Sequence, residues 1–144
     1  YCDKDFTAIK RLRGAGIEVC FLSGDERVNM AMAKNRNIPF YSARGKDKAD
    51  FVEPLELKYG VDRGEMLYIG DDLFDLSIMK AVGHAFCPQD APNILKEYCG
   101  FKNTIPRNGG ENVVAKMVDT LLERHQVRDC TMQEIEALDK QEKF

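Results

Sequence analysis

The sequence predicts an α/β protein with a parallel, Rossmann-like sheet and helices on both faces of that sheet. Short, continuous apolar segments alternate along the chain with longer segments in which apolar residues recur at helical spacing. Because strands without polar alternation suit a sheet that is covered on both sides, we expect them to pair in parallel. Right-handed crossovers then bring the loops that follow the strands to one edge of the sheet.

The first half of the chain shows this alternation directly. Asp5 can cap a first helix, which Gly14 and Gly16 end. Pro54 should kink or shift the helix in which it stands. The expected elements are a helix from Asp5, a strand over 17–22, a helix over 26–36, a strand over 38–42 and a helix over 48–58.

The second half repeats the pattern and ends in a charged segment. Apolar residues 66–69 predict the central buried strand, and the helix after it ends at Gly83. A long amphipathic helix is expected over 113–122, where apolar residues form one stripe. The other expected elements are a strand over 84–87, a short helix over 93–98 and an edge strand over 101–105. We expect residues 1–128 to form the core and residues 129–144 a charged tail or weakly anchored helix.

The composition is that of an ordinary globular domain. The chain has 144 residues, of which 44% are hydrophobic and 31% charged, and its net charge is −3. It has no basic block typical of nucleic-acid binding and no apolar run of membrane-spanning length. Its five scattered cysteines contain no C-x-x-C pair. That pattern fits a reducing compartment, so we expect a cytoplasmic protein.

Three aspartates follow the central strand, at the edge where open α/β sheets bind ligands. Asp71, Asp72 and Asp75 stand within five residues, directly after Gly70. Carboxylates this close repel one another, and a hard cation such as Mg²⁺ offsets that repulsion. One aspartate could simply cap the next helix. Three of them after a buried strand favour a metal or phosphate site.

Two further polar groups follow strands and are expected at the same edge. Ser23 and Gly24 open a helix, where a hydroxyl and free backbone N–H groups can bind phosphate, although a plain helix cap is the alternative. Lys48 begins a helix, where a cation is unfavourable, which favours pairing with a phosphate or with Asp75. Lys46 is a competing candidate for this role. The simpler alternative is that Lys48 is only a solvent-exposed lysine without a function. Together these groups suit phosphoryl transfer.

Residues 21–24, Lys48 and residues 69–75 resemble motifs two, three and four of the haloacid dehalogenase (HAD) superfamily. Most of the chain is similar to its small cap-less branch, which includes phosphatases of 3-deoxy-manno-octulosonate 8-phosphate and of sialic-acid-like 9-phosphates. The resemblance implies an Mg²⁺-dependent phosphatase that hydrolyses a phosphorylated sugar acid, the 8- or 9-phosphate of a 2-keto-3-deoxy sugar, through an aspartyl-phosphate. It also implies a homotetramer. From the composition we expect neither nucleic acid nor a membrane as a partner.

The same resemblance implies a role for each motif residue. Ser23 and the Gly24 amide bind the phosphoryl group, Lys48 neutralises it, and Asp75 supports Lys48 or the outer shell of the metal. Asp71 ligates Mg²⁺ directly, and Asp72 belongs to the metal site as a direct or outer ligand. The implied sets are Ser23, Lys48 and Asp75 for catalysis, Asp71 and Asp72 for metal, and Arg107, Gly109 and Gly110 for the substrate of a neighbouring subunit.

The chain departs from the family pattern in two places. The Asp-x-Asp motif that ends the family's first strand and holds its nucleophile is absent, and Asp3 and Asp5 cannot replace it because nothing apolar precedes them. We expect these two residues to follow a missing strand, which leaves the sheet without a central strand. Residues 31–33 are Ala-Met-Ala where this branch tends to carry a substrate-binding arginine, so the substrate could differ.

Two other functions stay open at this point. One is a catalytically inactive, HAD-like oligomerisation domain, as in sialic acid cytidylyltransferases. The absent nucleophile fits this alternative, whereas the retained Lys48 and the aspartates fit it poorly. The other is a receiver-like signalling domain, which is disfavoured because its acidic pocket normally precedes the first helix.

Overall fold

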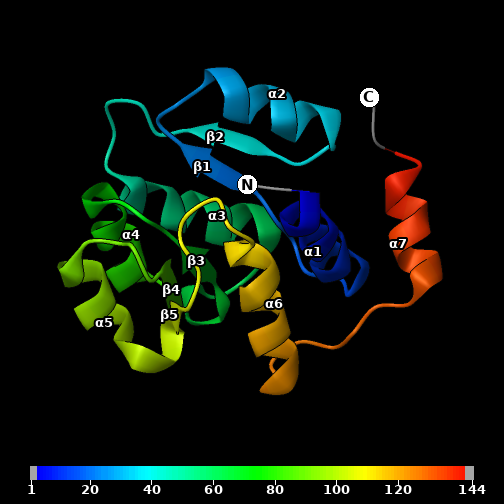
Figure 1. Cartoon of the computed structure of the whole chain (residues 1–144). Coiled ribbons are helices and arrows are strands. Elements are labelled where there is room, and N and C mark those ends of the chain that lie inside the picture. Colours follow the sequence, from blue (N-terminus) through cyan, green and yellow to red (C-terminus); the bar gives the residue numbers. More distant parts are fainter. Residues whose placement is uncertain (1–2, 142–144) are drawn as a thin grey trace.

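Helices and short strands alternate along the chain in the computed structural model, which describes residues 3–141 apart from the side chain of Val28 (Figure 1). The α/β class expected from the sequence is confirmed. The elements are α1 (Asp3–Gly14), β1 (Phe21–Ser23), α2 (Arg27–Asn35), β2 (Phe40–Ser42), η1 (Lys48–Phe51), α3 (Val52–Tyr59), η2 (Arg63–Glu65), β3 (Leu67–Ile69), η3 (Leu73–Asp75), α4 (Leu76–Ala81), β4 (His84–Pro88), α5 (Asn93–Asn103), β5 (Thr104–Ile105), α6 (Val113–Glu123) and α7 (Met132–Asp139).

The strands form two parallel sheets instead of one continuous sheet. β1 pairs with β2, and β3, β4 and β5 pair in that order. An apolar groove of about 580 Å³ is lined by residues of both β1 and β3. No strand lies between β1 and β3 among residues 3–141, as expected for a sheet that lacks a central strand. The parallel pairing predicted from the apolar segments is confirmed.

Several boundaries differ from the sequence-based expectation for local reasons. Strands 17–22 and 38–42 shrink to β1 and β2, whose three residues each are the ones that pair with one another. The helix expected over 48–58 starts as the 3₁₀ helix η1, and Pro54 falls in the first turn of α3, where proline is tolerated. The edge strand shrinks to Thr104–Ile105 because α5 runs on to Asn103 through a kink at Gly100.

The larger apolar core joins α1, β4 and α6, so it fixes the elements around the site described below. Phe6 of α1, Phe86 of β4 and Met117 of α6 all belong to this core. A smaller core joins α4, β4 and α5. Burial of each large apolar side chain contributes about 1.5–3 kcal/mol. Both cores therefore hold β4, whose last residue, Pro88, lines the site.

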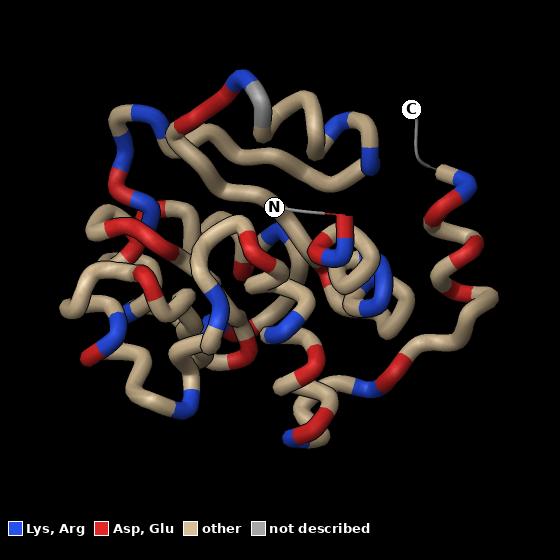
Figure 2. The backbone as a smooth tube through the Cα atoms, viewed as in Figure 1, with Lys and Arg blue, Asp and Glu red and all other residues tan. Residues whose placement is uncertain are grey.

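The charged C-terminal segment forms a helix beside α1 (Figures 1 and 2). Lys10 of α1 lies 2.6 Å from a carboxylate oxygen of Asp139. The Thr131 and Glu134 side chains cap α7 reciprocally, and Arg128 pairs with Glu134. Figure 2 shows acidic residues along α7 and basic residues on α1. The Lys10–Asp139 ion pair thus ties α7 to α1, and Ile135 and Leu138 of α7 are half-buried.

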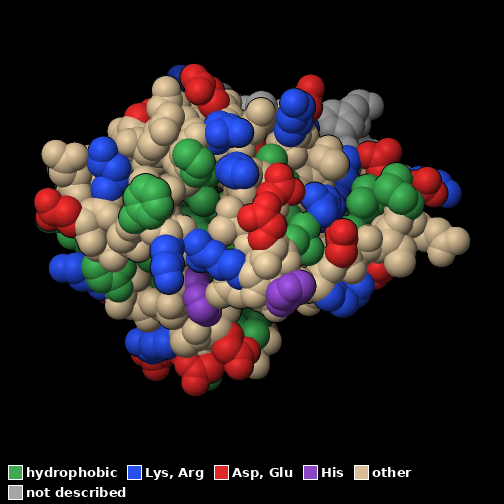
Figure 3. All heavy atoms as spheres, turned by 60° about the horizontal axis from the view of Figure 1, so that its bottom comes forward, with side chains coloured by type: hydrophobic (Ala, Val, Ile, Leu, Met, Phe, Trp, Pro, Cys, Tyr) green, Lys and Arg blue, Asp and Glu red, His purple; other side chains and the backbone are tan. Residues whose placement is uncertain are grey.

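The surface carries charges of both signs. Figure 3 shows Lys and Arg side chains interspersed with Asp and Glu on one face of the molecule, in keeping with the small net charge of −3. Within residues 3–141, no helix has the length and apolar character that crossing a membrane requires.

Candidate active site

Asp75 is the centre of a dense hydrogen-bond network at the end of β3. One of its carboxylate oxygens, Oδ1, accepts hydrogen bonds from Lys48 Nζ and from the Tyr68 hydroxyl, each at 2.6 Å. The other oxygen, Oδ2, accepts from the backbone N–H groups of Asp71 and Asp72, each at 3.0 Å. Asp75 is only 3% exposed. Its carboxylate therefore has a fixed position, with every partner supplied by the protein.

The protonation of Asp75 follows from these contacts. Burial raises the pKa of the carboxyl, but the hydrogen bonds from Lys48 and Tyr68 outweigh it and hold that pKa below its ordinary value. Asp75 thus stays ionised and balances the charge of Lys48. One of the three N–H groups of Lys48 is used in this pair, and the others can reach a ligand, since Lys48 lines a cavity.

Gly70 makes the tight turn before Asp75 possible. A Cβ atom at position 70 would lie 2.5 Å from the Cβ of Asp75, so no larger residue fits without a shift of the backbone. Asp72 then caps η3, because its Oδ1 accepts a hydrogen bond from Leu73 N at 2.6 Å. The sequence left open that one of the three aspartates simply caps the next helix, and in the structure that aspartate is Asp72.

Asp71 also lines the cavity, and its carboxylate serves neither as the cap of η3 nor in the ion pair with Lys48. Desolvation raises the pKa of its carboxyl, and the negative charges of Asp75 and Asp72 raise it further. A cation at this carboxylate would relieve that repulsion, and carboxylate oxygens suit Mg²⁺. Residues 3–141 contain no group of three or more acidic, histidine or cysteine side chains that could hold a metal ion. Among the described residues, the Asp71 carboxylate is therefore the side chain that would bind a metal ion at this cavity.

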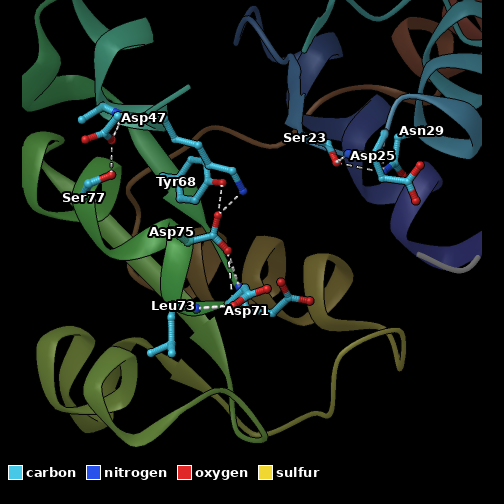
Figure 4. Close-up of polar contacts among 12 residues, drawn as sticks. Ser23, Asp25, Asn29, Asp47, Tyr68, Asp71, Leu73, Asp75 and Ser77 are labelled. Carbon is cyan, nitrogen blue, oxygen red and sulfur yellow. Dashed lines mark hydrogen bonds and ion pairs between the residues drawn. The ribbon is translucent and has the colours of Figure 1, made fainter. Parts of the chain in front are cut away.

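Ser23 lies across the cavity from these groups. Figure 4 shows Ser23, Asp25 and Asn29 on one side, and Tyr68, Asp75 and Asp71 on the other. The Ser23 hydroxyl oxygen accepts hydrogen bonds from Asp25 N and from Asn29 Nδ2, each at 3.1 Å. The hydroxyl is thus held at the end of β1, facing the groups that follow β3.

A cavity of about 340 Å³ brings these groups together. Of the residues expected at the site, Ser23, Lys48, Asp71, Asp75 and Gly110 line it. The expected convergence of remote segments at one edge is therefore present in the structure.

Four of the expected residues do not line the cavity: Gly24, Asp72, Arg107 and Gly109. The Arg107 guanidinium donates to Pro106 O, and Gly109 N donates to Asp90 Oδ1. Gly110 lines the cavity of its own chain, so a reach into a neighbouring subunit stays a prediction.

Sequence reasoning missed the roles of three polar side chains that line the cavity: Asp5, Asn29 and Tyr68. Asp5 was expected to cap the first helix, but α1 begins at Asp3 and contains Asp5 within it. The Asp5 carboxylate instead accepts a hydrogen bond from Ala115 N near the start of α6, at 3.0 Å. In the sequence, only one feature could have pointed to Asn29 as a site residue. It stands one turn into the helix that follows Ser23.

Comparison with known proteins identifies relatives of this arrangement. Residues 25–118 match the profile of the haloacid dehalogenase-like hydrolases. The 3-deoxy-D-manno-octulosonate 8-phosphate phosphatase of Haemophilus influenzae is 29% identical over 121 residues, which cover 83% of this chain and 66% of that protein. The chain thus spans just under two thirds of this relative's length.

Solved structures show the same fold. The cobalt-bound form of the Haemophilus influenzae phosphatase superposes with a TM-score of 0.79 at 29% identity, over 88% of this chain and 73% of that one. The Moraxella catarrhalis phosphatase, in complex with magnesium, phosphate and KDO, has a TM-score of 0.74 at 21% identity, over 83% and 68%. At 21% identity the second likeness is one of fold alone.

Proposed function

Because the chain belongs to the haloacid dehalogenase-like hydrolases, we propose that it serves as an Mg²⁺-dependent phosphatase of a phosphorylated sugar acid. The observation that carries the proposal is that Ser23, Lys48 and Asp71 line one cavity. The relative at 29% identity, a phosphatase of 3-deoxy-D-manno-octulosonate 8-phosphate, supports the 8-phosphate of a 2-keto-3-deoxy sugar as the substrate, and the motif resemblance adds the 9-phosphates as candidates.

Each residue contributes a distinct part of phosphate binding. Lys48, oriented by Asp75, places positive charge beside the phosphoryl oxygens, and the Ser23 hydroxyl donates to one of them from the opposite side. Asp71 would hold Mg²⁺, which when bound supplies positive charge to the phosphoryl group. Asp75 takes no proton in this scheme, because its hydrogen bonds keep it ionised.

The groove between the two sheets suggests where the nucleophile lies. β1 ends at Ser23 and β3 is followed by Gly70 and Asp71, so both strands run toward the cavity. A further strand seated in the groove, parallel to both, would also end there. We propose that the first aspartate of an Asp-x-Asp at the end of such a strand attacks phosphorus and forms an aspartyl-phosphate as the bond between phosphorus and the sugar oxygen breaks. The second aspartate gives its proton to the leaving sugar oxygen, and water then hydrolyses the aspartyl-phosphate.

Restoring such a strand tests the function. We expect the chain with an added N-terminal apolar strand ending in Asp-x-Asp, followed by a hairpin, to release phosphate from sugar acid 8- or 9-phosphates when Mg²⁺ is present. Replacing the first of those aspartates by asparagine should abolish the release while phosphate still binds. Absence of release from every 8- or 9-phosphorylated sugar acid, in a protein that folds and binds phosphate, would contradict the proposal.

We further propose a cytoplasmic homotetramer. The four cysteines in the described part of the chain are unpaired thiols, which suits a reducing compartment. Light scattering of the purified protein measures its mass, and a monomer would contradict the tetramer. The inactive oligomerisation domain is not proposed, because Lys48, Asp71 and Asp75 are retained around one cavity.

A further inference from the structure

The hydroxyl of Ser23 has both of its acceptor positions occupied. Its oxygen accepts one hydrogen bond from Asp25 N and one from Asn29 Nδ2, each at 3.1 Å. A hydroxyl offers two lone pairs and one proton. With both lone pairs in use, the Ser23 O–H can act only as a donor. Among the described residues it has no acceptor, so the proton is available to the cavity that Ser23 lines.

The side chain of Asn29 has its orientation fixed by two acceptors. Its Nδ2 donates to Ser23 Oγ at 3.1 Å and to the backbone oxygen of Asp25 at 3.3 Å. A flipped amide would place its own oxygen against both of these oxygens, so the network selects the orientation with nitrogen toward Ser23. Asn29 is half-buried and itself lines the cavity.

Resting on the proposed function, we propose that Asn29 is a positioning residue that commits the Ser23 hydroxyl to donating into the cavity. The matching ligand is a tetrahedral oxyanion such as a phosphoryl group, whose ionised oxygens only accept hydrogen bonds. Lys48, which lines the same cavity, supplies the other donor. A ligand group that must itself donate to Ser23 would find no free lone pair.

Substitutions at position 29 separate this role from simple packing. In Asn29→Asp the new carboxylate can only accept, so the Ser23 hydroxyl turns toward it and is withdrawn from the ligand. In Asn29→Ala one lone pair of Ser23 becomes free, and the hydroxyl can still donate but is no longer fixed. Asn35→Asp is the matched control, because it adds the same charge at an exposed position on the same helix.

The test measures the binding of inorganic phosphate to the 144-residue chain. A ³¹P NMR titration in the presence of Mg²⁺ monitors this binding. We expect Asn29→Asp to weaken phosphate binding by about 10- to 100-fold, the usual effect of losing a hydrogen bond to a charged group. Asn35→Asp should change it by less than about twofold, as an exposed substitution. In the Ser23→Ala background, Asn29→Ala should cause no further loss, because Asn29 acts only through the Ser23 hydroxyl.

Three results would overturn the inference. They are no phosphate binding by the unaltered chain, equal binding by the Asn29→Asp and Asn35→Asp variants, and the same loss from Asn29→Ala with and without the Ser23 hydroxyl. The outcome is independent of turnover. Phosphate binding that depends on the Ser23–Asn29 pair, without any phosphate release by the strand-restored protein, would contradict the phosphatase function and leave this inference standing.

Discussion

The ammonium of Lys48 lies 2.6 Å from Oδ1 of Asp75, 27 residues further along the chain. The side chains are 17% and 4% exposed, so this ion pair is largely shielded from water. It joins η1, which follows β2, to η3, which follows β3, and these two strands belong to different sheets. The pair thus links segments that follow the two sheets at the cavity.

Replacing Asp75 by asparagine should destabilise the protein strongly. The change leaves Lys48 without its counter-charge and weakens the hydrogen bonds from Tyr68 and from two backbone N–H groups. We expect the free energy of unfolding to fall by about 3 kcal/mol, as for other broken buried pairs. Urea denaturation measures it. Asp72→Asn is the control, since asparagine also caps helices well, and an equal loss in both variants would contradict the prediction.

The same pair predicts an acid-sensitive part of the stability. The pKa of Asp75 in the folded protein lies below its ordinary value of 3.8. A lowered pKa gives stability that is fully present above the ordinary value and is lost as pH falls through the folded-state value. The stability difference between the wild type and Asp75→Asn should therefore shrink below a pH of about 4. Urea midpoints over a pH series measure this, and a constant difference would refute it.

Addition of Mg²⁺ should stabilise the protein through Asp71. A ligand that binds only the folded state raises the free energy of unfolding by about 2.7 kcal/mol at a hundredfold excess over its dissociation constant. We expect a rise in melting temperature on titration with Mg²⁺, reversed by a chelator, and its loss in Asp71→Asn. Asp62→Asn, at the cap of η2, is the matched control. An equal rise in the Asp71 variant would place the ion elsewhere.

Gly70 should not tolerate alanine. The added methyl group would lie 2.5 Å from Asp75 Cβ and 2.7 Å from its carboxyl carbon, so the turn has to move. We expect a loss of about 1–3 kcal/mol, typical of overpacking, together with weaker phosphate binding because Lys48 loses its orientation. Gly64→Ala is the control, where the methyl group meets only Asp62 Oδ1 at 3.5 Å. Equal urea midpoints for the two variants would rule out the steric argument.

The docking of α7 should weaken in acid. Hydrogen bonds from Arg128 and from Thr131 N lower the pKa of Glu134 to about 2. Because this pKa is depressed from 4.5, the stabilisation is complete above that ordinary value and is lost as pH falls toward about 2. The protection factors for amide exchange within α7, which correct for the intrinsic pH dependence of exchange, should therefore fall over this range. Glu134→Gln should show fast exchange at neutral pH, whereas Glu136→Gln, exposed on the same helix, should not.

The sequence by itself determined the elements and the edge at which the polar groups gather. Apolar runs such as 66–69 and the stripe over 113–122 are local patterns, and β3 and α6 follow them within a few residues. The sequence also predicted that Ser23, Lys48 and Asp71 converge, because parallel strands place the loops after them at one edge.

Only the tertiary structure decided what each polar side chain does there. The spacing of the aspartates does not distinguish Asp72, which caps η3, from Asp75, which pairs with Lys48, or from Asp71, which lines the cavity and does neither. Asp5 contacts Ala115, 110 residues away. Hydrogen bonds depend on distances of about 3 Å and on direction. Apolar periodicity sets which face of an element is buried, whereas these distances exist only after remote segments have packed together.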